Sequence, residues 1–289
     1  MILREPRKIV TAQRQIEGAG FVVRRPLPSE ELEMVDPILL IDEMGPVEYG
    51  PGEAVGAPDH PHRGFETVTY SLEGEFEHED SAGHRGVLRA GDVQWMTAGA
   101  GIIHSEMPSR RIRDEGGRVH GFQIWVNLPA RLKMTRPRYQ EVPAGTIPQA
   151  STADGRARVR VVAGEVLGAR AVIDTRTPIV FQDWTLDELA DVTVPVPSSH
   201  NAVAYVFEGS ARVGEQLLRE GQLAVLDSGD AVRLRGGKGR LLLLAGEPLR
   251  ERVAHYGPFV MNSDEEIVQA MRDFQSGRMG EITRTALVD

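Results

Sequence analysis

Two short pairs of side chains are the residues of this sequence best suited to chemistry. His60 and His62 flank a proline, and His104 and Glu106 flank a serine further along the chain. Residues at positions i and i+2 of an extended segment project from the same face. Each pair therefore has the spacing of two metal ligands on one strand. If the two strands are neighbours, the pairs can converge on a single ion.

The types of these side chains limit both the metal and its role. Three imidazoles and one carboxylate suit Fe(II), Mn(II), Ni(II), Cu(II) or Zn(II), and affinity alone does not choose among them. The chain has no cysteine, which excludes disulfides, thiolate catalysis and zinc–thiolate sites. Four protein ligands on an octahedral ion leave two positions open, which is typical of a catalytic rather than a closed structural site.

A competing oxygen ligand is Glu66, which has the same strand parity as His60 and His62. Spacing alone does not rank Glu66 against Glu106. A single pair of histidines at this spacing more often lies on the surface or in the core by coincidence than binds a metal. Two such pairs in one domain favour a metal site.

Composition and charge exclude several classes of function. Of the 289 residues, 41% are hydrophobic and 26% charged, which is typical of a globular protein with a packed core. The formal net charge of -9 repels polyphosphate, so nucleic acid and anionic membranes are poor partners. Apolar runs are short, and the charged first residues do not fit a signal peptide. We expect a cytoplasmic protein that contacts neither nucleic acid nor membrane directly.

The elements that must position the candidate ligands are short strands. The 31 glycines and 18 prolines punctuate segments that alternate apolar and polar residues. The expected strands include Thr67 to Leu72, Val87 to Met96, Gly121 to Leu128, Ala202 to Phe207 and Arg240 to Ala245. A helical period occurs only near the C-terminus, where a capping box at Ser263 begins a helix that Gly277 ends.

An internal repeat indicates how these strands are organised. The strings YSLEG and LRAG in the first half return as YVFEG and LREG in the second half, in the same order. We interpret the repeat as a duplicated β-domain of the double-sheet barrel type. The boundary is expected in the proline-rich stretch 129–148, which gives domains of residues 1–135 and 136–289, the second with the C-terminal helix.

Longer strings of the sequence resemble one family closely. The chain contains PDHPHRGFETVTYSLEGEFEHEDSAGHRG, GDVQWMTAGAGIIHSEMP and HGFQIWVNLPARLKMTRPRYQ, with DPILLIDEMGPVEYGPG upstream and HYGPFVMN downstream. These strings resemble the pirin branch of the cupins over nearly the whole chain. The resemblance implies an all-β fold of two stacked cupin barrels with a short C-terminal α-helix, and a metal only in the N-terminal barrel.

The resemblance also implies a set of ligands. Carried over onto this sequence, they are His60, His62, His104 and Glu106, with one divalent metal, Fe(II) by expectation, per chain. It thereby favours Glu106 over Glu66, which is expected to hydrogen-bond near the site but stays open as a fifth or alternate ligand. Thr97 departs from the wider cupin pattern, which usually has proline there.

The repeat predicts that the second copy lacks a metal. The positions that correspond to the four candidate ligands are occupied by Pro195, Pro197, Leu234 and Gly236, none of which offers a ligand atom. His200 lies close by in the sequence and leaves the point open.

Several further residues allow two interpretations. Arg63 is either a charge beside the ligands or at the pocket entrance, or half of a surface salt bridge. Phe122 and Trp125 are either core aromatics or the walls of a pocket for a flat ligand. His78 and His84 are predicted to be solvated hairpin residues.

Two functions of different kinds follow from the resemblance. The first is a quercetin 2,3-dioxygenase type of enzyme, in which the metal binds a planar aromatic flavonol, O2 cleaves its central ring and Glu106 serves as the catalytic base. The second is a regulatory protein of transcription or central metabolism whose iron redox state controls binding to a protein partner. An isomerase or small-acid binder of the wider cupin kind is a third interpretation.

Overall fold

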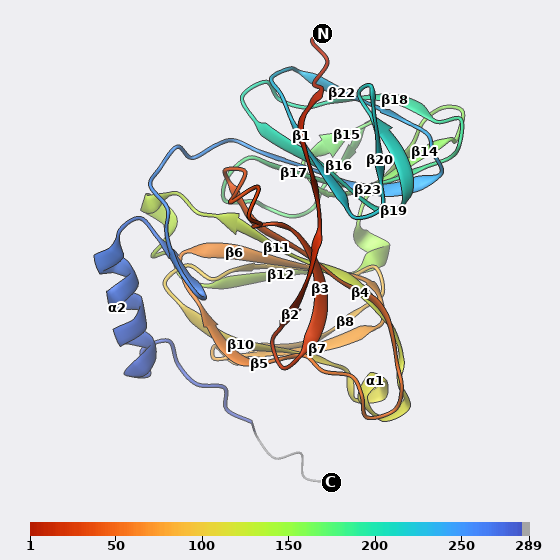
Figure 1. The fold of residues 1–289 in the computed structure, drawn as a ribbon. Helices are drawn as coiled ribbons and strands as arrows, with labels where there is room; N and C mark the ends of the chain where they lie inside the picture. Colours follow the sequence, from red (N-terminus) through yellow and green to blue (C-terminus); the bar gives the residue numbers. More distant parts are fainter. Residues whose placement is uncertain (285–289) are drawn as a thin grey trace. The chain divides into compact units, whose positions relative to one another are not determined.

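The structure is a computed structural model that describes residues 1–284 of the chain. These residues form mostly β-strands, with a short helix α1 (Arg110–Glu115) and a longer helix α2 (Asp264–Gln275) (Figure 1). Two 3-10 turns occur at Ala130–Leu132 and Ala144–Thr146. The prediction of an all-β protein with a short C-terminal helix is confirmed. No helix in residues 1–284 is long and apolar enough to cross a membrane.

The chain forms two compact units, each assembled from separate segments. Unit 1 comprises Met1–Arg14, Arg24–Glu43 and Ala144–Leu249, and unit 2 comprises Gln15–Val23, Met44–Pro143 and the chain from Arg250. These units differ from the predicted boundaries of 1–135 and 136–289 at both ends of the chain. The reason is strand pairing and packing: β1 (Pro6–Thr11) pairs with β21 (Gln222–Leu226), while α2 packs its buried Ile267 and Ala270 near Ile103 of unit 2.

Two sheets carry the residues singled out from the sequence. The smaller has the strand order β5-β10-β7-β8, and the larger has the order β12-β9-β6-β11-β4-β3-β2. The smaller sheet contains β5 (Ala57–His62), β7 (Glu75–Asp80), β8 (Arg85–Arg89) and β10 (Ile102–Pro108). The larger contains β2 (Gln13–Glu17), β3 (Phe21–Leu27), β4 (Ile38–Tyr49), β6 (Phe65–Glu73), β9 (Val93–Thr97), β11 (Gly117–Asn127) and β12 (Arg138–Val142).

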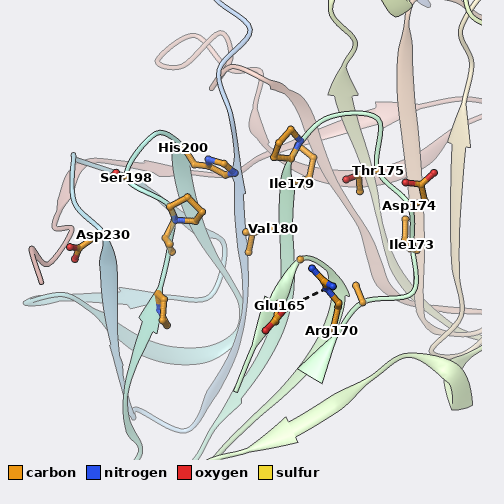
Figure 2. Close-up of a pocket in the computed structure, with 16 residues that line it drawn as sticks. Glu165, Arg170, Ile173, Asp174, Thr175, Ile179, Val180, Ser198, His200 and Asp230 are labelled. Atoms are coloured by element: carbon orange, nitrogen blue, oxygen red, sulfur yellow. Dashed lines mark ion pairs between the residues drawn. The ribbon is translucent and has the colours of Figure 1, made fainter. Parts of the chain in front are cut away.

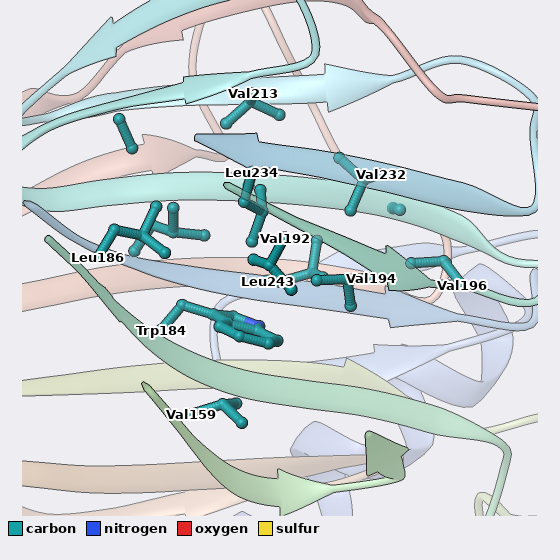
Figure 3. Packing of buried hydrophobic residues seen from close by; sticks show 14 of the residues in the cluster. Val159, Trp184, Leu186, Val192, Val194, Val196, Val213, Val232, Leu234 and Leu243 are labelled. Carbon is teal, nitrogen blue, oxygen red and sulfur yellow. The ribbon is translucent and has the colours of Figure 1, made fainter. Parts of the chain in front are cut away.

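Unit 1 is built on a sheet whose main path is β1-β21-β19-β23-β17-β14-β13, with β18, β20 and β22 paired off that path. Its other strands are β13 (Gln149–Ser151), β14 (Ala157–Ala163), β17 (Ile179–Leu186), β18 (Asp191–Pro195), β19 (Asn201–Val213), β20 (Gln216–Arg219), β22 (Ala231–Arg235) and β23 (Gly239–Gly246). Their inward side chains form one apolar core around Trp184, Val194 and Leu234 (Figure 3).

Two small hairpins are β15 (Glu165–Val166) with β16 (Ala169–Arg170), and β24 (Ala254–Tyr256) with β25 (Phe259–Met261).

The strands expected from the alternation of apolar and polar residues are present, and one of them is divided into two strands. Four of the five predicted segments overlap single strands, namely β6, β11, β19 and β23. The fifth, Val87 to Met96, is split into β8 and β9 because Gly91 takes a positive φ of 88° in the turn between them. Helix α2 begins at the predicted capping box, in which Ser263 and Glu266 cap each other, and Gly277 with φ 74° follows its end.

Candidate metal centre

Three histidines from two neighbouring strands meet at one point of unit 2. Strand β5 places His60 and His62, and β10 places His104 directly opposite His60. The candidate ligand nitrogens of the three rings lie within 4.8 Å of one another. The Nε2 atoms of His60 and His62 are 3.0 Å apart. Two nitrogens bound at right angles to one ion, each about 2.1 Å from it, are also about 3.0 Å apart.

Burial keeps two of these rings uncharged. Burial, followed by the neighbouring His60 ring, holds the pKa of both His62 and His104 well below the ordinary value for histidine. The carbonyl of Pro258 near His62 offsets part of the shift for that ring. Neutral imidazoles have the lone pairs that a metal ion requires.

The hydrogen bonds of the rings fit a metal ion at this point. The Nδ1 atom of His60 lies 2.7 Å from the carbonyl oxygen of Pro58, which only accepts, so Nδ1 carries the proton and Nε2 has a free lone pair. Both ring nitrogens of buried His104 have no hydrogen-bond partner within the described chain. An unpaired buried nitrogen costs free energy unless water or an ion satisfies it. The three histidines therefore match a transition-metal site.

Glu106 lies on β10 beside the histidines, and its carboxylate is held by two donors. The Thr69 hydroxyl donates to its Oε1 at 2.6 Å, and the Gln123 amide donates to its Oε2 at 2.7 Å. The carboxylate is not part of the tight group that the three histidine nitrogens form. Each oxygen keeps a second lone pair, so these hydrogen bonds leave the carboxylate able to bind an ion.

Glu66 projects from the opposite face of its strand. On β6, Thr67 and Thr69 face the site, whereas Glu66 pairs with Val126 and accepts a hydrogen bond of 2.6 Å from the Thr97 hydroxyl. The parity argument linking Glu66 to the histidines fails because the chain changes sheets between His62 and Phe65. Gly64, with φ 91°, makes that change of direction.

The two aromatic candidates on β11 also lie on opposite faces. Trp125 packs against His62 with ring centroids 5.2 Å apart, and Phe65 lies against both rings. Phe122 is buried and pairs with Tyr70 on the other face, together with Glu66, which favours the interpretation of Phe122 as a core aromatic. Strand alternation separates Trp125, beside the site, from Phe122, behind the sheet.

Arg63 is buried and points to helix α2. Its Nη1 donates to Asp273 at 2.8 Å, and its Nε donates to the carbonyl of Ala100 at 2.7 Å. The guanidinium is therefore neither a charge beside the ligands nor half of a surface pair, but a buried tie between the ligand strand and the C-terminal residues.

The residues 250–284, which include β24, β25 and α2, are here named the C-terminal clasp. Buried Lys133 donates to the carbonyls of Gly64 and Val260 at 2.7 and 2.9 Å. His255 adds a ring 6.2 Å from Trp125. Sequence reasoning missed this contribution because it assigned the C-terminal helix to the other domain.

A second polar group lies on the same inner surface and was also missed. His78, predicted to be solvated, is only 2% exposed, pairs with Glu106 across β7 and β10, and stacks on Tyr139. Burial and the nearby Asp80 and Glu106 carboxylates raise the pKa of Tyr139 far above its ordinary value, so the phenol stays protonated. The available signal was parity, since His78 shares its face of β7 with Phe76 and Asp80, and all three are buried. His84, by contrast, is exposed as predicted and pairs with Asp80.

Unit 1 has no comparable centre among the described residues, where the three histidines are the only group of this kind. Leu234, at the position corresponding to His104, is part of the apolar core. His200 lines a pocket of about 750 Å³ together with prolines, aliphatic side chains and the charged residues Glu165, Arg170, Asp174 and Asp230 (Figure 2). The absence of a metal from this unit stays a prediction.

Models of known protein families match segments in both halves of the chain. The Pirin family model matches residues 20–126, which include all the candidate ligands, and the model of the Pirin C-terminal cupin domain matches residues 181–280. A pirin-like protein of Solanum lycopersicum is 43% identical over 279 residues, covering 94% of this chain and 92% of that protein.

Two bacterial proteins with an enzyme name are also similar. A putative quercetin 2,3-dioxygenase of Pseudomonas aeruginosa is 41% identical over 271 residues, which cover 92% of this chain and 95% of that protein. The crystal structure of a quercetin 2,3-dioxygenase from Acinetobacter baumannii superposes with a TM-score of 0.91 at 36% identity, covering 97% of this chain and all of that one.

Proposed function

Because the chain belongs to the pirin family of cupin proteins, we propose that it is a metal-dependent dioxygenase acting on a flavonol such as quercetin. The observation that carries the proposal is the meeting of three histidine rings at one point, where burial keeps His62 and His104 uncharged and leaves both ring nitrogens of His104 without a partner in the described chain. The similarity to proteins named quercetin 2,3-dioxygenase supports the choice of reaction.

The residues proposed to hold the ion are His60, His62, His104 and Glu106, and Fe(II) is the proposed ion. When bound, it would supply Lewis-acid and redox chemistry for the reaction of a flavonol with O2. The Pro58 carbonyl fixes the His60 ring through Nδ1, so that Nε2 faces the site.

The other side chains of the site bind and orient the substrate. The indole of Trp125 and the ring of Phe65 form an apolar wall beside His62, suited to a flat aromatic ring. The Glu106 carboxylate accepts the proton of the flavonol 3-hydroxyl, and Thr69 and Gln123 keep that carboxylate in place.

The test is turnover of quercetin by protein loaded with iron. Quercetin absorbance should fall while O2 is consumed and carbon monoxide is released in proportion. All three signals should vanish in metal-free protein and in His62→Ala. Iron-loaded protein that retains its metal and consumes no O2 with any flavonol would rule out the proposed activity.

A second function, redox-dependent binding of a protein partner, is favoured by the C-terminal clasp. The ion pair of Arg63 with Asp273 ties the residue after His62 to α2, and Arg284 pairs with Asp59 beside His60. A change in the metal at these histidines therefore has a short path to a surface helix. Amide hydrogen exchange in α2 that differs between ferrous and ferric protein would support this function, and identical exchange would argue against it.

A further inference from the structure

Two deeply buried polar atoms on the inner surface of unit 2 are not used by the metal centre. They are Nε2 of Gln94 and Nδ1 of His78, and both residues are 2% exposed. Neither atom has a hydrogen-bond partner in the described part of the chain. A buried amide or ring nitrogen is rarely left unpaired, so such atoms mark places where water or a ligand binds.

Gln94 belongs to a row of polar side chains that leads away from Glu106. The row runs across four adjacent strands as Gln123, Thr69, Gln94 and Glu141, each directly opposite the next. Residues directly opposite on neighbouring strands share a face of the sheet. Gln94 therefore lies on the same inner face as Thr69, which donates to Glu106.

His78 reaches the end of this row from the facing sheet. Its Nε2 lies 2.8 Å from Oε1 of Glu141, and Glu141 is the strand partner of Gln94. A Cβ on Gly86 would lie 2.2 Å from that Nε2, so glycine at this position leaves room for the ring. Glu141 is thus a neighbour of both residues, of His78 through its carboxylate and of Gln94 through strand pairing.

The hydrogen-bonding roles of the two free atoms are complementary. In the ring form that carries its hydrogen on Nε2, beside the Glu141 carboxylate, Nδ1 of His78 is an acceptor. Nε2 of Gln94 is a donor. One donor and one acceptor match a hydroxyl group, which both accepts and donates.

The distance from the metal centre suits a ligand bound at two points. His78 is opposite Glu106, and β5 with His60 lies two strands from β7 in the same sheet. With adjacent strands about 4.8 Å apart, this places the pair about 5 to 10 Å from the three histidines.

We propose that Gln94 and His78 form a hydroxyl-binding subsite that selects flavonols with a phenolic hydroxyl on an outer ring. The proposal rests on the proposed function, in which the 3-hydroxyl and 4-carbonyl end of the flavonol lies at the metal centre. Gln94 donates to the oxygen of the outer hydroxyl, and that hydroxyl donates to His78.

The experiment measures binding rather than turnover, with protein loaded with redox-inert Zn(II). Quercetin is compared with 3-hydroxyflavone, which has the same chelating unit and no outer hydroxyls, and the absorbance shift of each flavonol gives its Kd. The variants are Gln94→Leu and, as matched control, Gln140→Leu, which makes the same change on the other face of the sheet, opposite Trp95. The change in the ratio of the two Kd values isolates the contact with the hydroxyl.

The unaltered protein should bind quercetin about 10-fold more tightly than 3-hydroxyflavone, because a lost hydrogen bond leaves buried groups unpaired. Gln94→Leu should remove most of this preference without weakening 3-hydroxyflavone, and Gln140→Leu should retain it. Equal binding of the two flavonols by the unaltered protein overturns the subsite while leaving the proposed function intact. Failure of the unaltered protein to bind either flavonol overturns the flavonol assignment itself, and the subsite with it.

Discussion

The interiors of the two units differ although the sequence marks them as copies. Unit 1 is filled by an apolar core that includes Trp184, Val194 and Leu234 (Figure 3). The corresponding interior of unit 2 carries histidines, carboxylates and amides, several with unpaired atoms in the described residues. An apolar core stabilises its own unit, whereas buried unpaired polar groups weaken theirs until an ion or ligand satisfies them. We infer from this difference that unit 1 contributes mainly stability, whereas unit 2 holds the candidate binding site.

The largest expected effect is on metal content. His104→Ala removes one of three converging nitrogens and should reduce metal affinity by more than the about 10- to 100-fold typical of losing a group that merely supports a ligand. Elemental analysis of purified protein should give one ion for the unaltered chain. The control His200→Ala, in unit 1, should leave the content unchanged. Two tightly held ions, or full retention in His104→Ala, would contradict the contrast between the units.

The next prediction is that truncation of the core lowers the free energy of unfolding in unit 1, whereas replacing a buried polar side chain by an apolar one does not lower it in unit 2. Leu234→Ala should lower the free energy of unfolding by about 2 to 5 kcal/mol, since it leaves a cavity in the core of unit 1. His104→Leu, at the matching place in unit 2, should be neutral or stabilising in metal-free protein, because it removes unpaired buried nitrogens. Urea unfolding of metal-free protein measures both. A large loss of stability from His104→Leu would show that the polar interior of unit 2 is stable without a bound ion or ligand.

The third prediction concerns which carboxylate of unit 2 binds the metal. Glu106→Ala should weaken metal binding more than Glu66→Ala, because Glu66 lies behind the sheet, bonded to Thr97. Metal titration of the two variants measures the ranking. A greater loss from Glu66→Ala would mean that the face assigned to β6 is wrong.

The smallest effect concerns the C-terminal clasp. Hydrogen bonding from Arg63 holds the pKa of Asp273 below its ordinary value. A depressed carboxyl pKa stabilises the fold above the unfolded value of about 3.9, and this stabilisation disappears as the pH falls through the folded pKa. Amide exchange in α2 should therefore accelerate below about pH 4, and Arg63→Met should move the onset to higher pH. An onset that Arg63→Met does not move would show that another contact fastens α2.

Local rules predicted the convergence of His60, His62 and His104 and failed where the chain leaves a strand. The i, i+2 rule placed His60 with His62 correctly because both lie on β5. It failed for Glu66, because Gly64 turns the chain into another sheet and resets the parity. The strands and α2 were predicted from alternation and capping, which are also local.

Long-range pairing was beyond such rules. The row through Gln94 and the approach of His78 depend on which strands are neighbours, and no short string encodes that order. The two units differ from the predicted segments for the same reason, since β1 pairs with β21 across most of the sequence.

The contacts of the C-terminal clasp have a consequence for the order of events during synthesis. All the candidate ligands are translated before residues 250–284, yet Arg63 gains its backbone partner Val260 and its ion-pair partner Asp273 only from that later segment. A Cβ on Gly64 would lie 2.0 Å from the Val260 carbonyl, so this contact is close-fitting. Domains usually fold as units during translation. Here the strand that carries His60 and His62 can gain these contacts only after residues 250–284 have been synthesised, so we expect the candidate metal site to be completed late in folding.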